Sequence, residues 1–232
     1  MRPSFSNMIP LMTSETKSLL LNGTNQYVLM PDIDNTSLRS AFTMSAWVKS
    51  SDVVTDQTII GIGTGSSVMD MRFYQGGVSL TTYSGSWASV AATTTNTSDV
   101  VHVAVTYDGT TARIYYNGSL DNSGTISAAS AAATCTFTVG CDQSRAAGFL
   151  DGSVAGVILC DVKLEDADIT EINNLGVPKQ PEDYSTAITD NYVMALPLNT
   201  GVVDPETDRS LLSNDGVLTN SPTYTGEVIA FE

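Results

Sequence analysis

The 232-residue sequence is poor in cationic side chains, in histidine and in cysteine. It has ten Lys and Arg against 25 Asp and Glu, one His and three Cys, and its net charge is −15. This charge repels phosphates and anionic lipids, so neither nucleic acid nor a membrane surface is an expected partner. Cys135 and Cys141 are about 20 Å apart along an extended strand, beyond disulfide reach. We expect three buried free thiols, with a bridge from Cys160 to one of the others as the alternative.

Long hydrophobic runs are missing as well. The longest apolar runs, such as residues 154–160, have the length of a strand, so we expect no transmembrane helix. The apolar core of a secretory signal does not follow Met1 and Arg2. Asn-x-Ser/Thr sequons are therefore expected in turns and loops rather than as glycan acceptors. They lie at Asn22, Asn35, Asn96 and Asn117.

The most informative segment that is present covers residues 100–120. Two runs of β-branched and aromatic residues flank Asp108-Gly109, and a second turn signal follows at Asn117-Gly118. Such dipeptides supply the positive φ angles that tight hairpins need. Alternation places Val101, Val103, Val105 and Tyr107 on one face, and His102, Ala104 and Thr106 on the other. The segment predicts a hairpin with one buried face in an antiparallel all-β domain.

This hairpin resembles the laminin-G-like jelly roll of the concanavalin A-like lectin and glucanase superfamily. Other stretches resemble the same family: residues 21–28, 42–49, 149–154, 164–172 and 216–222. Together the resemblance covers roughly residues 20–225. It implies a two-sheet antiparallel jelly-roll sandwich with Trp47 buried. The segment 216–222 resembles one that usually precedes the opening strand, which implies a permuted order, because the ends of a sandwich can lie close together.

The expected organisation is one domain with an N-terminal extension. Residues 1–17 form an arm without periodicity, and residues 18–232 form a single jelly-roll domain whose closing segment, 177–232, returns to the sandwich. One short helix is expected over residues 164–175, where apolar residues recur at helical spacing. A strand is expected over residues 192–198, near a sheet edge or a bulge because Pro197 cannot donate to a ladder.

Paired carboxylates are the first candidate for catalysis. The resemblance implies that glycosidases of this superfamily carry Glu-x-Asp-x-x-Glu on a strand, and Asp166, Asp168 and Glu171 have the matching spacing. They fall in the expected helix, however, where they form an acidic first turn rather than the lining of a groove. His102 has no serine or cysteine in a recognised catalytic arrangement and is expected to be structural or to contact a ligand. We predict that the protein is not an enzyme.

Calcium is the one cofactor left open. The resemblance implies a calcium ion at the rim of many relatives, held by carboxylates and carbonyls. Asp32, Asp34 and Asp151 are the candidate ligands. Residues 32–43 begin like an EF-hand loop but lack its glycine and its final acid, and the acids that relatives carry in the late strand are replaced at 155–156. We therefore predict no cofactor, with a rim calcium as the alternative.

Ligand-binding residues are predicted from strand alternation. Met69, Met71 and Phe73 are expected to face the core, which turns the neighbouring polar residues outward. If these strands lie near the hairpin, aromatic planes and polar donors suited to sugar rings share a face. Trp87, expected in a loop, joins them. The predicted set is Arg72, Tyr74, Tyr83, Trp87, His102, Arg113 and Tyr115. The alternative is an ordinary half-polar outer sheet.

These observations favour a non-enzymatic surface-recognition or assembly protein. The resemblance extends to laminin-G-like domains in bacteriophage particles, and a glycan-type fold without a secretion signal suits a protein released by lysis. The leading hypothesis is a virion surface protein, a capsid decoration or tail-fibre component, with host surface glycans as ligands. Its arm, residues 1–17, would contact other virion proteins or copies of itself. The alternative is a stand-alone carbohydrate-binding, lectin-like module.

Overall fold

The computed structural model describes residues 17–34, 36–52, 54–64, 67–95, 99–127, 134–174, 179–198 and 205–225. The strands are β1 (Ser18–Asn22), β2 (Tyr27–Asp34), β3 (Phe42–Ser50), β4 (Gln57–Thr64), β5 (Ser67–Tyr74), β6 (Gly77–Tyr83), β7 (Trp87–Ala91), β8 (Val101–Tyr107), β9 (Thr111–Tyr116), β10 (Ser119–Thr125), β11 (Thr134–Val139), β12 (Asp151–Cys160), β13 (Tyr192–Leu196), β14 (Val217–Thr219) and β15 (Thr223–Thr225). The helices are α1 (Asp166–Asn173) and α2 (Thr186–Thr189), with 3-10 turns at Ser37–Arg39 and Pro181–Asp183.

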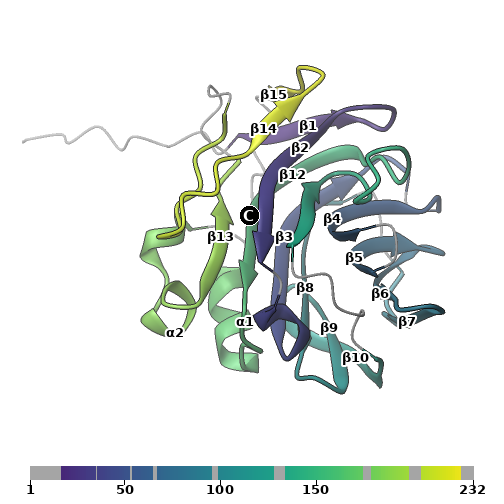
Figure 1. Cartoon of the computed structure of the whole chain (residues 1–232), viewed down its shortest axis with the longest axis vertical. Helices are drawn as coiled ribbons and strands as arrows, with labels where there is room; N and C mark the ends of the chain where they lie inside the picture. The colour runs from purple at the N-terminus through teal and green to yellow at the C-terminus, as the bar shows by residue number, and fades with distance from the viewer. Residues whose placement is uncertain are drawn as a thin grey trace, which may run out of the picture.

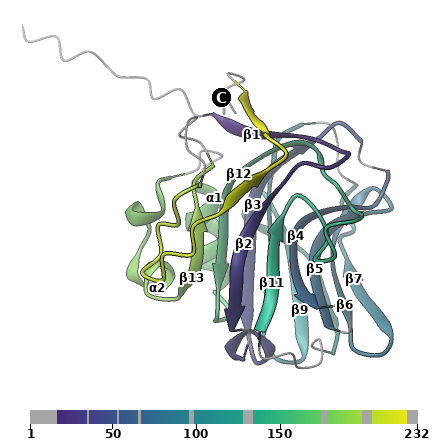
Figure 2. The same ribbon diagram turned by 45° about the horizontal axis from the view of Figure 1, so that its top comes forward.

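These strands form two antiparallel sheets packed face to face (Figure 2). Sheet A has the order β10-β9-β8-β3-β12-β1-β15, and β13 also pairs with β12. Sheet B has the order β14-β2-β11-β4-β5-β6-β7. The predicted all-β jelly-roll sandwich is therefore confirmed. Of the two helices in the described residues, α1 was predicted over a longer range, 164–175, and the single turn α2 was not predicted.

The main core lies between the two sheets. Val103 and Val105 of β8 face inward, as do Met71 and Phe73 of β5, and all are fully buried. Alternation predicted these directions correctly. The turn at Gly109 is also confirmed, since its φ is +97° and the Asp108 carboxylate accepts the Thr111 N–H at 2.8 Å.

A second apolar cluster covers the outer face of sheet A. Ala104, Tyr115 and Ile158 of the sheet pack there against Ile169 and Ile172 of α1, and residues 184–195 complete the cluster. Figure 1 shows α1, α2 and β13 on this side of the molecule, opposite β4–β7. The hairpin is therefore buried on both faces. The prediction of a single buried face was wrong because alternation does not reveal what later segments pack on a sheet.

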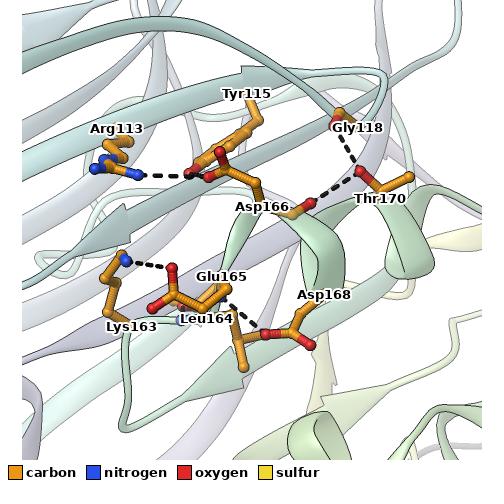
Figure 3. A network of polar contacts seen from close by, with 10 residues as sticks. Arg113, Tyr115, Gly118, Lys163, Leu164, Glu165, Asp166, Asp168 and Thr170 are labelled. Carbon is orange, nitrogen blue, oxygen red and sulfur yellow. Dashed lines mark hydrogen bonds and ion pairs between the residues drawn. The ribbon is translucent and has the colours of Figure 1, made fainter.

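Polar contacts attach α1 to β9 (Figure 3). The Tyr115 hydroxyl donates to Asp166 Oδ1 at 2.8 Å, and Arg113 Nη1 lies 3.4 Å from the same oxygen. At the start of the helix the Glu165 N–H donates to the Asp168 carboxylate at 2.9 Å, which satisfies a backbone donor that the helix leaves free. The contacts to Asp166 fix α1 against sheet A, and the contact to Asp168 caps the helix.

The C-terminal segment completes both sheet edges next to the opening strands. Val217 of β14 pairs with Leu29 of β2, and Tyr224 of β15 pairs with Leu19 of β1. This is the placement that a permuted order requires. The strand with Pro197 after its end, β13, pairs with β12 alone among the described strands, as expected for an edge. Residues 1–16 of the predicted arm lie outside the described residues.

Candidate functional site

A cavity of about 290 Å³ opens on the outer face of sheet B, over β5, β6 and β7. We call it the β5–β7 groove. Its lining residues are Asp56, Arg72, Tyr74, Thr81, Trp87, Ala88 and Ser89. Three of the residues predicted from sequence, Arg72, Tyr74 and Trp87, therefore lie together.

Strand register explains this grouping. Asp70 lies opposite Thr81 in the β5–β6 ladder, and Thr81 lies opposite Ser89 in the β6–β7 ladder. Directly paired residues point to the same face of a sheet, so a row of polar side chains crosses three strands. Thr81 and Ser89 were not in the predicted set. Ser89 lies two residues after Trp87 on the same face of β7, and it was missed because Trp87 was expected in a loop, where alternation was not applied.

Aromatic side chains form one end of the groove. Trp87 is 61% exposed and is the first residue of β7, not a loop residue as predicted. It pairs across the ladder with Tyr83, and the two ring centroids are 4.9 Å apart at an interplanar angle of 49°. A large exposed indole supported by a second ring offers an apolar surface with polar groups beside it.

An ion pair forms part of the groove. Arg72 Nη2 lies 2.6 Å from Asp70 Oδ2, with the Asp70 side chain fully buried and the Arg72 side chain 16% exposed. Burial raises the pKa of Asp70 to about 7; the Arg72 charge opposes this shift and the Asp142 carboxylate adds to it. Asp70 Oδ1 and Arg72 Nε are buried and have no hydrogen-bond partner among the described residues.

The loop between β11 and β12 limits the groove on the β4 side. The Thr58 N–H donates to the Gly148 carbonyl at 2.8 Å, and Thr138 Oγ1 donates to the Cys141 carbonyl at 2.7 Å. A Cβ at Gly61 would lie 2.8 Å from the same Cys141 carbonyl, so the loop lies directly on β4. The outer face is therefore covered at β4 and open at β5–β7.

The other predicted ligand residues do not belong to this groove. His102, Arg113 and Tyr115 lie on β8 and β9, in sheet A, on the opposite side of the sandwich from β5–β7. The shared face was expected only if these strands lie near the hairpin, and that condition is not met, because alternation assigns a face of a strand but not the sheet. Arg113 and Tyr115 contact Asp166 of α1 instead of a ligand.

His102 is fully buried and inaccessible to a ligand. Its Nε2 is 2.8 Å from Ser45 Oγ, and its ring centroid is 4.9 Å from that of Trp47, which is buried as the resemblance implied. Burial lowers the pKa of His102 to about 3. The residue is a neutral, structural histidine.

The acids spaced like a glycosidase motif lie on the outside of sheet A, in and around α1. Asp166 accepts the Tyr115 hydroxyl, Asp168 accepts the Glu165 N–H, and Glu171 Oε1 accepts the Ser185 N–H at 2.7 Å. All three lie in the helix, as predicted. They lie on the other side of the sandwich from the groove: Asp166 and Glu171 bind neighbouring segments, and Asp168 caps the helix.

The candidate calcium ligands are far apart. Asp151 begins β12 opposite Asn22, whereas Asp32 and Asp34 lie at the other end of the sandwich, where β2 ends. A polar pocket of about 450 Å³ does adjoin Asp151. The Asp151 carboxylate accepts the Ser51 hydroxyl there, and Asp52 accepts the Thr55 hydroxyl, which lowers the pKa of Asp52. Within the described ranges, no three His, Cys, Asp or Glu side chains are placed to hold a metal ion.

The three cysteines are free and buried, as expected. Cys135 lies on β11 of sheet B and Cys160 on β12 of sheet A. Cys135 packs in the main core between the sheets and Cys160 in the cluster on the outer face of sheet A, and all three thiols are free, so the alternative bridge from Cys160 is not formed. No helix in the described part of the chain is long and apolar enough to cross a membrane.

Residues 22–170 match the family model Laminin_G_3, described as the concanavalin A-like lectin/glucanases superfamily. The chain belongs to this superfamily. No curated protein matches the sequence.

Solved structures share the fold at low identity. A Bacteroides ovatus protein to which carbohydrate binding is ascribed is 17% identical, with a TM-score of 0.65. The match covers 90% of this chain and 59% of the Bacteroides protein, so this chain spans little more than half the length of that relative. Domain 4 of an extracellular arabinanase from Geobacillus stearothermophilus, in complex with arabinotriose, is 21% identical (TM-score 0.57, covering 67% and 76%). The CBM40 of a Ruminococcus gnavus sialidase, bound to α2,3-sialyllactose, is 13% identical (TM-score 0.54, covering 69% and 99%). At these identities the likeness establishes the fold alone.

Proposed function

We propose that this protein is a non-enzymatic carbohydrate-binding module whose ligand occupies the β5–β7 groove. The observation that carries the proposal is the exposed indole of Trp87, placed beside Tyr83 and above a row of hydroxyl and charged groups. Sugar rings present apolar C–H faces that pack on aromatic planes, and hydroxyls that need donors and acceptors nearby. The groove offers both, in a volume suited to a short segment of a glycan.

The relatives support this class of function. The arabinanase domain and the CBM40 were each obtained with an oligosaccharide, arabinotriose and α2,3-sialyllactose respectively. Fold alone does not fix a ligand, so the proposal depends on the groove's own side chains. The acids with glycosidase-like spacing are held in and around α1, which supports binding without hydrolysis.

The test is a glycan panel with variants of the groove. Wild-type protein is expected to bind at least one oligosaccharide, and Trp87→Ala is expected to weaken that binding about tenfold or more, because the stacking surface is lost. Leu211→Ala is the matched control, since Leu211 is 98% exposed but lies on the C-terminal segment, away from the groove. Equal binding by wild type and Trp87→Ala would contradict the assignment of the groove. Release of reducing sugar by the pure protein would contradict the absence of catalysis.

Attachment to a virion surface is a separate proposal that rests on the sequence alone. It involves residues 1–17, and deleting them is expected to leave the melting transition nearly intact, because the first strand begins at Ser18. The same deletion is expected to weaken association with a particle or with other copies. Unfolding of the truncated protein, or its undiminished assembly, would contradict this part of the proposal.

A further inference from the structure

The β5–β7 groove contains a specificity element in addition to its stacking surface. Resting on the proposed function, we infer that Asp70 is a specificity-determining residue: by pairing with Arg72 it restricts the groove to uncharged glycans and disfavours those that carry carboxylates, such as sialic or uronic acids. Of the two similar structures solved with an oligosaccharide, one holds a neutral sugar, arabinotriose, and the other an acidic one, α2,3-sialyllactose. The choice for this chain therefore has to come from its own charges.

Arg72 is the single cation among the residues that line the groove. An unpaired guanidinium would recruit a sugar carboxylate, because its fork of N–H donors matches two carboxylate oxygens. Asp70 already occupies Nη2 of that fork at 2.6 Å and cancels its charge. A second carboxylate arriving from a ligand would meet a neutral pair instead of a free cation.

The surrounding charges act in the same direction. Asp56 lines the groove, and Asp142 on the β11–β12 loop is close enough to raise the pKa of Asp70. Arg145 on the same loop offsets one of these charges. With Asp70 ionised, the acids still outnumber the cations, so the groove and its margin carry net negative charge. Neutral hydroxyls are not subject to this repulsion, and Thr81 and Ser89 remain available to bond them.

The charge of the Asp70–Arg72 pair changes with pH, so the inference can be tested in the unaltered protein. The folded-state pKa of Asp70 is about 7, so the pair is neutral at pH 8 and becomes cationic as the pH falls below 7. Sugar carboxylates stay ionised down to about pH 4. Tolerance of acidic glycans should therefore rise between pH 8 and pH 5.5 in the unaltered protein.

The experiment compares matched neutral and acidic oligosaccharides, such as lactose and α2,3-sialyllactose, or arabinotriose and a uronic acid trimer, each titrated calorimetrically. At pH 8 the wild type is expected to prefer the neutral member of a pair that it binds, and Asp70→Asn is expected to reduce that preference on the order of tenfold by gaining affinity for the acidic member. Asp190→Asn, which removes one exposed charge elsewhere, is expected to keep the wild-type preference. Melting curves check that each variant is folded.

The wild type across pH 8 to 5.5 provides the same test without a substitution, and its acidic-to-neutral affinity ratio is expected to rise. An unchanged ratio in both Asp70→Asn and the pH series would overturn the inference, as would a wild type that prefers the acidic member at pH 8. Either result leaves the carbohydrate-binding proposal standing. Failure of the wild type to bind any neutral or acidic glycan instead overturns that proposal, and with it this inference.

Discussion

At the scale of single residues, His102 shows how burial decides chemistry. The imidazole lies between Ser45 and Trp47, fully buried, and burial lowers its pKa to about 3. As it is the single histidine in the chain, its ring resonances can be followed by NMR without assignment ambiguity. We predict that they stay constant from pH 8 to pH 5. A titration midpoint near 6.5 would contradict the buried, neutral state.

His102 and Asp70 change the free energy of unfolding with pH in opposite directions. His102 has a folded-state pKa below its ordinary 6.5, so its contribution lowers the free energy of unfolding as the pH falls below about 6.5. Asp70 has a folded-state pKa above its ordinary 3.8, so its contribution is fully present below 3.8 and is lost as the pH rises towards 7. The two contributions oppose each other over much of this range. The ring resonances therefore report on His102 more directly than a melting curve does.

Sequence alone predicted part of the candidate site. Arg72 and Tyr74 were placed outward by alternation, and the groove confirms their direction. His102 and Tyr115 were also placed outward, correctly, but this outer face is covered by other segments. Strand alternation reports a direction and carries no information about which sheet a strand joins or what packs over it. The Asp70–Arg72 ion pair joins two residues of the same strand, so alternation is compatible with it, but the full burial of Asp70 depends on what packs over β5.

At the scale of elements, the pairing of β12 depends on Gly152, which lies in the segment 149–154 that resembles the family. Gly152 lies where β12 pairs with both β1 and β3, and a Cβ at this position would lie 1.9 Å from the Lys49 carbonyl oxygen. Gly152→Ala is expected to lower the free energy of unfolding by about 3 kcal/mol or more, because backbone strands must separate to make room. Chemical denaturation measures the loss.

Gly85→Ala is the control for this substitution. Both glycines have a positive φ, +156° at Gly152 and +90° at Gly85, but a Cβ at Gly85 would have no atom within 4 Å. Its expected cost is about 1 kcal/mol, from backbone conformation alone. Equal losses for the two variants would show that the close approach of β12 and β3 is not what requires a glycine at position 152.

Element prediction succeeded where local chemistry decides and failed where packing decides. The turns at Gly109 and Gly118 have the positive φ that their dipeptides predicted. The helix α1 begins two residues after the predicted start, at Asp166, where the Glu165 N–H meets the Asp168 carboxylate. The short helix α2 gave no periodic signal, since four residues make only one turn and its stability comes from burying Ile188 against sheet A.

At the scale of the whole molecule, we predict that the sandwich is stable without a metal ion. The candidate ligands Asp32 and Asp151 lie at opposite ends of the sandwich. Asp151 accepts the Ser51 hydroxyl, and its neighbour Asp52 accepts the Thr55 hydroxyl. A calcium ion bound to the native state alone would add about 2.7 kcal/mol at a hundredfold excess over its Kd. We predict that a chelator leaves the melting temperature unchanged. A fall of several degrees would contradict this prediction.

The architecture was predictable because alternating strands and turn dipeptides recur along the chain. The closing segment is the informative case. Residues 216–222 resemble a segment that usually comes first, and the structure pairs β14 with β2 and β15 with β1. The groove was less predictable. Its walls β5, β6 and β7 are consecutive strands joined by short turns, so their adjacency is local. No local pattern shows that the β11–β12 loop covers the outer face at β4 and leaves β5–β7 open.

Tryptophan quenching can show directly whether a glycan stacks on Trp87 in the β5–β7 groove. The chain has two tryptophans; Trp47 is 1% exposed and Trp87 is 61% exposed, so acrylamide acts mainly on Trp87. With a saturating oligosaccharide chosen from the panel, we predict a blue shift of the emission and a marked loss of quenching, both absent in Trp87→Ala. A bound glycan that leaves the quenching of Trp87 unchanged would contradict this stacking.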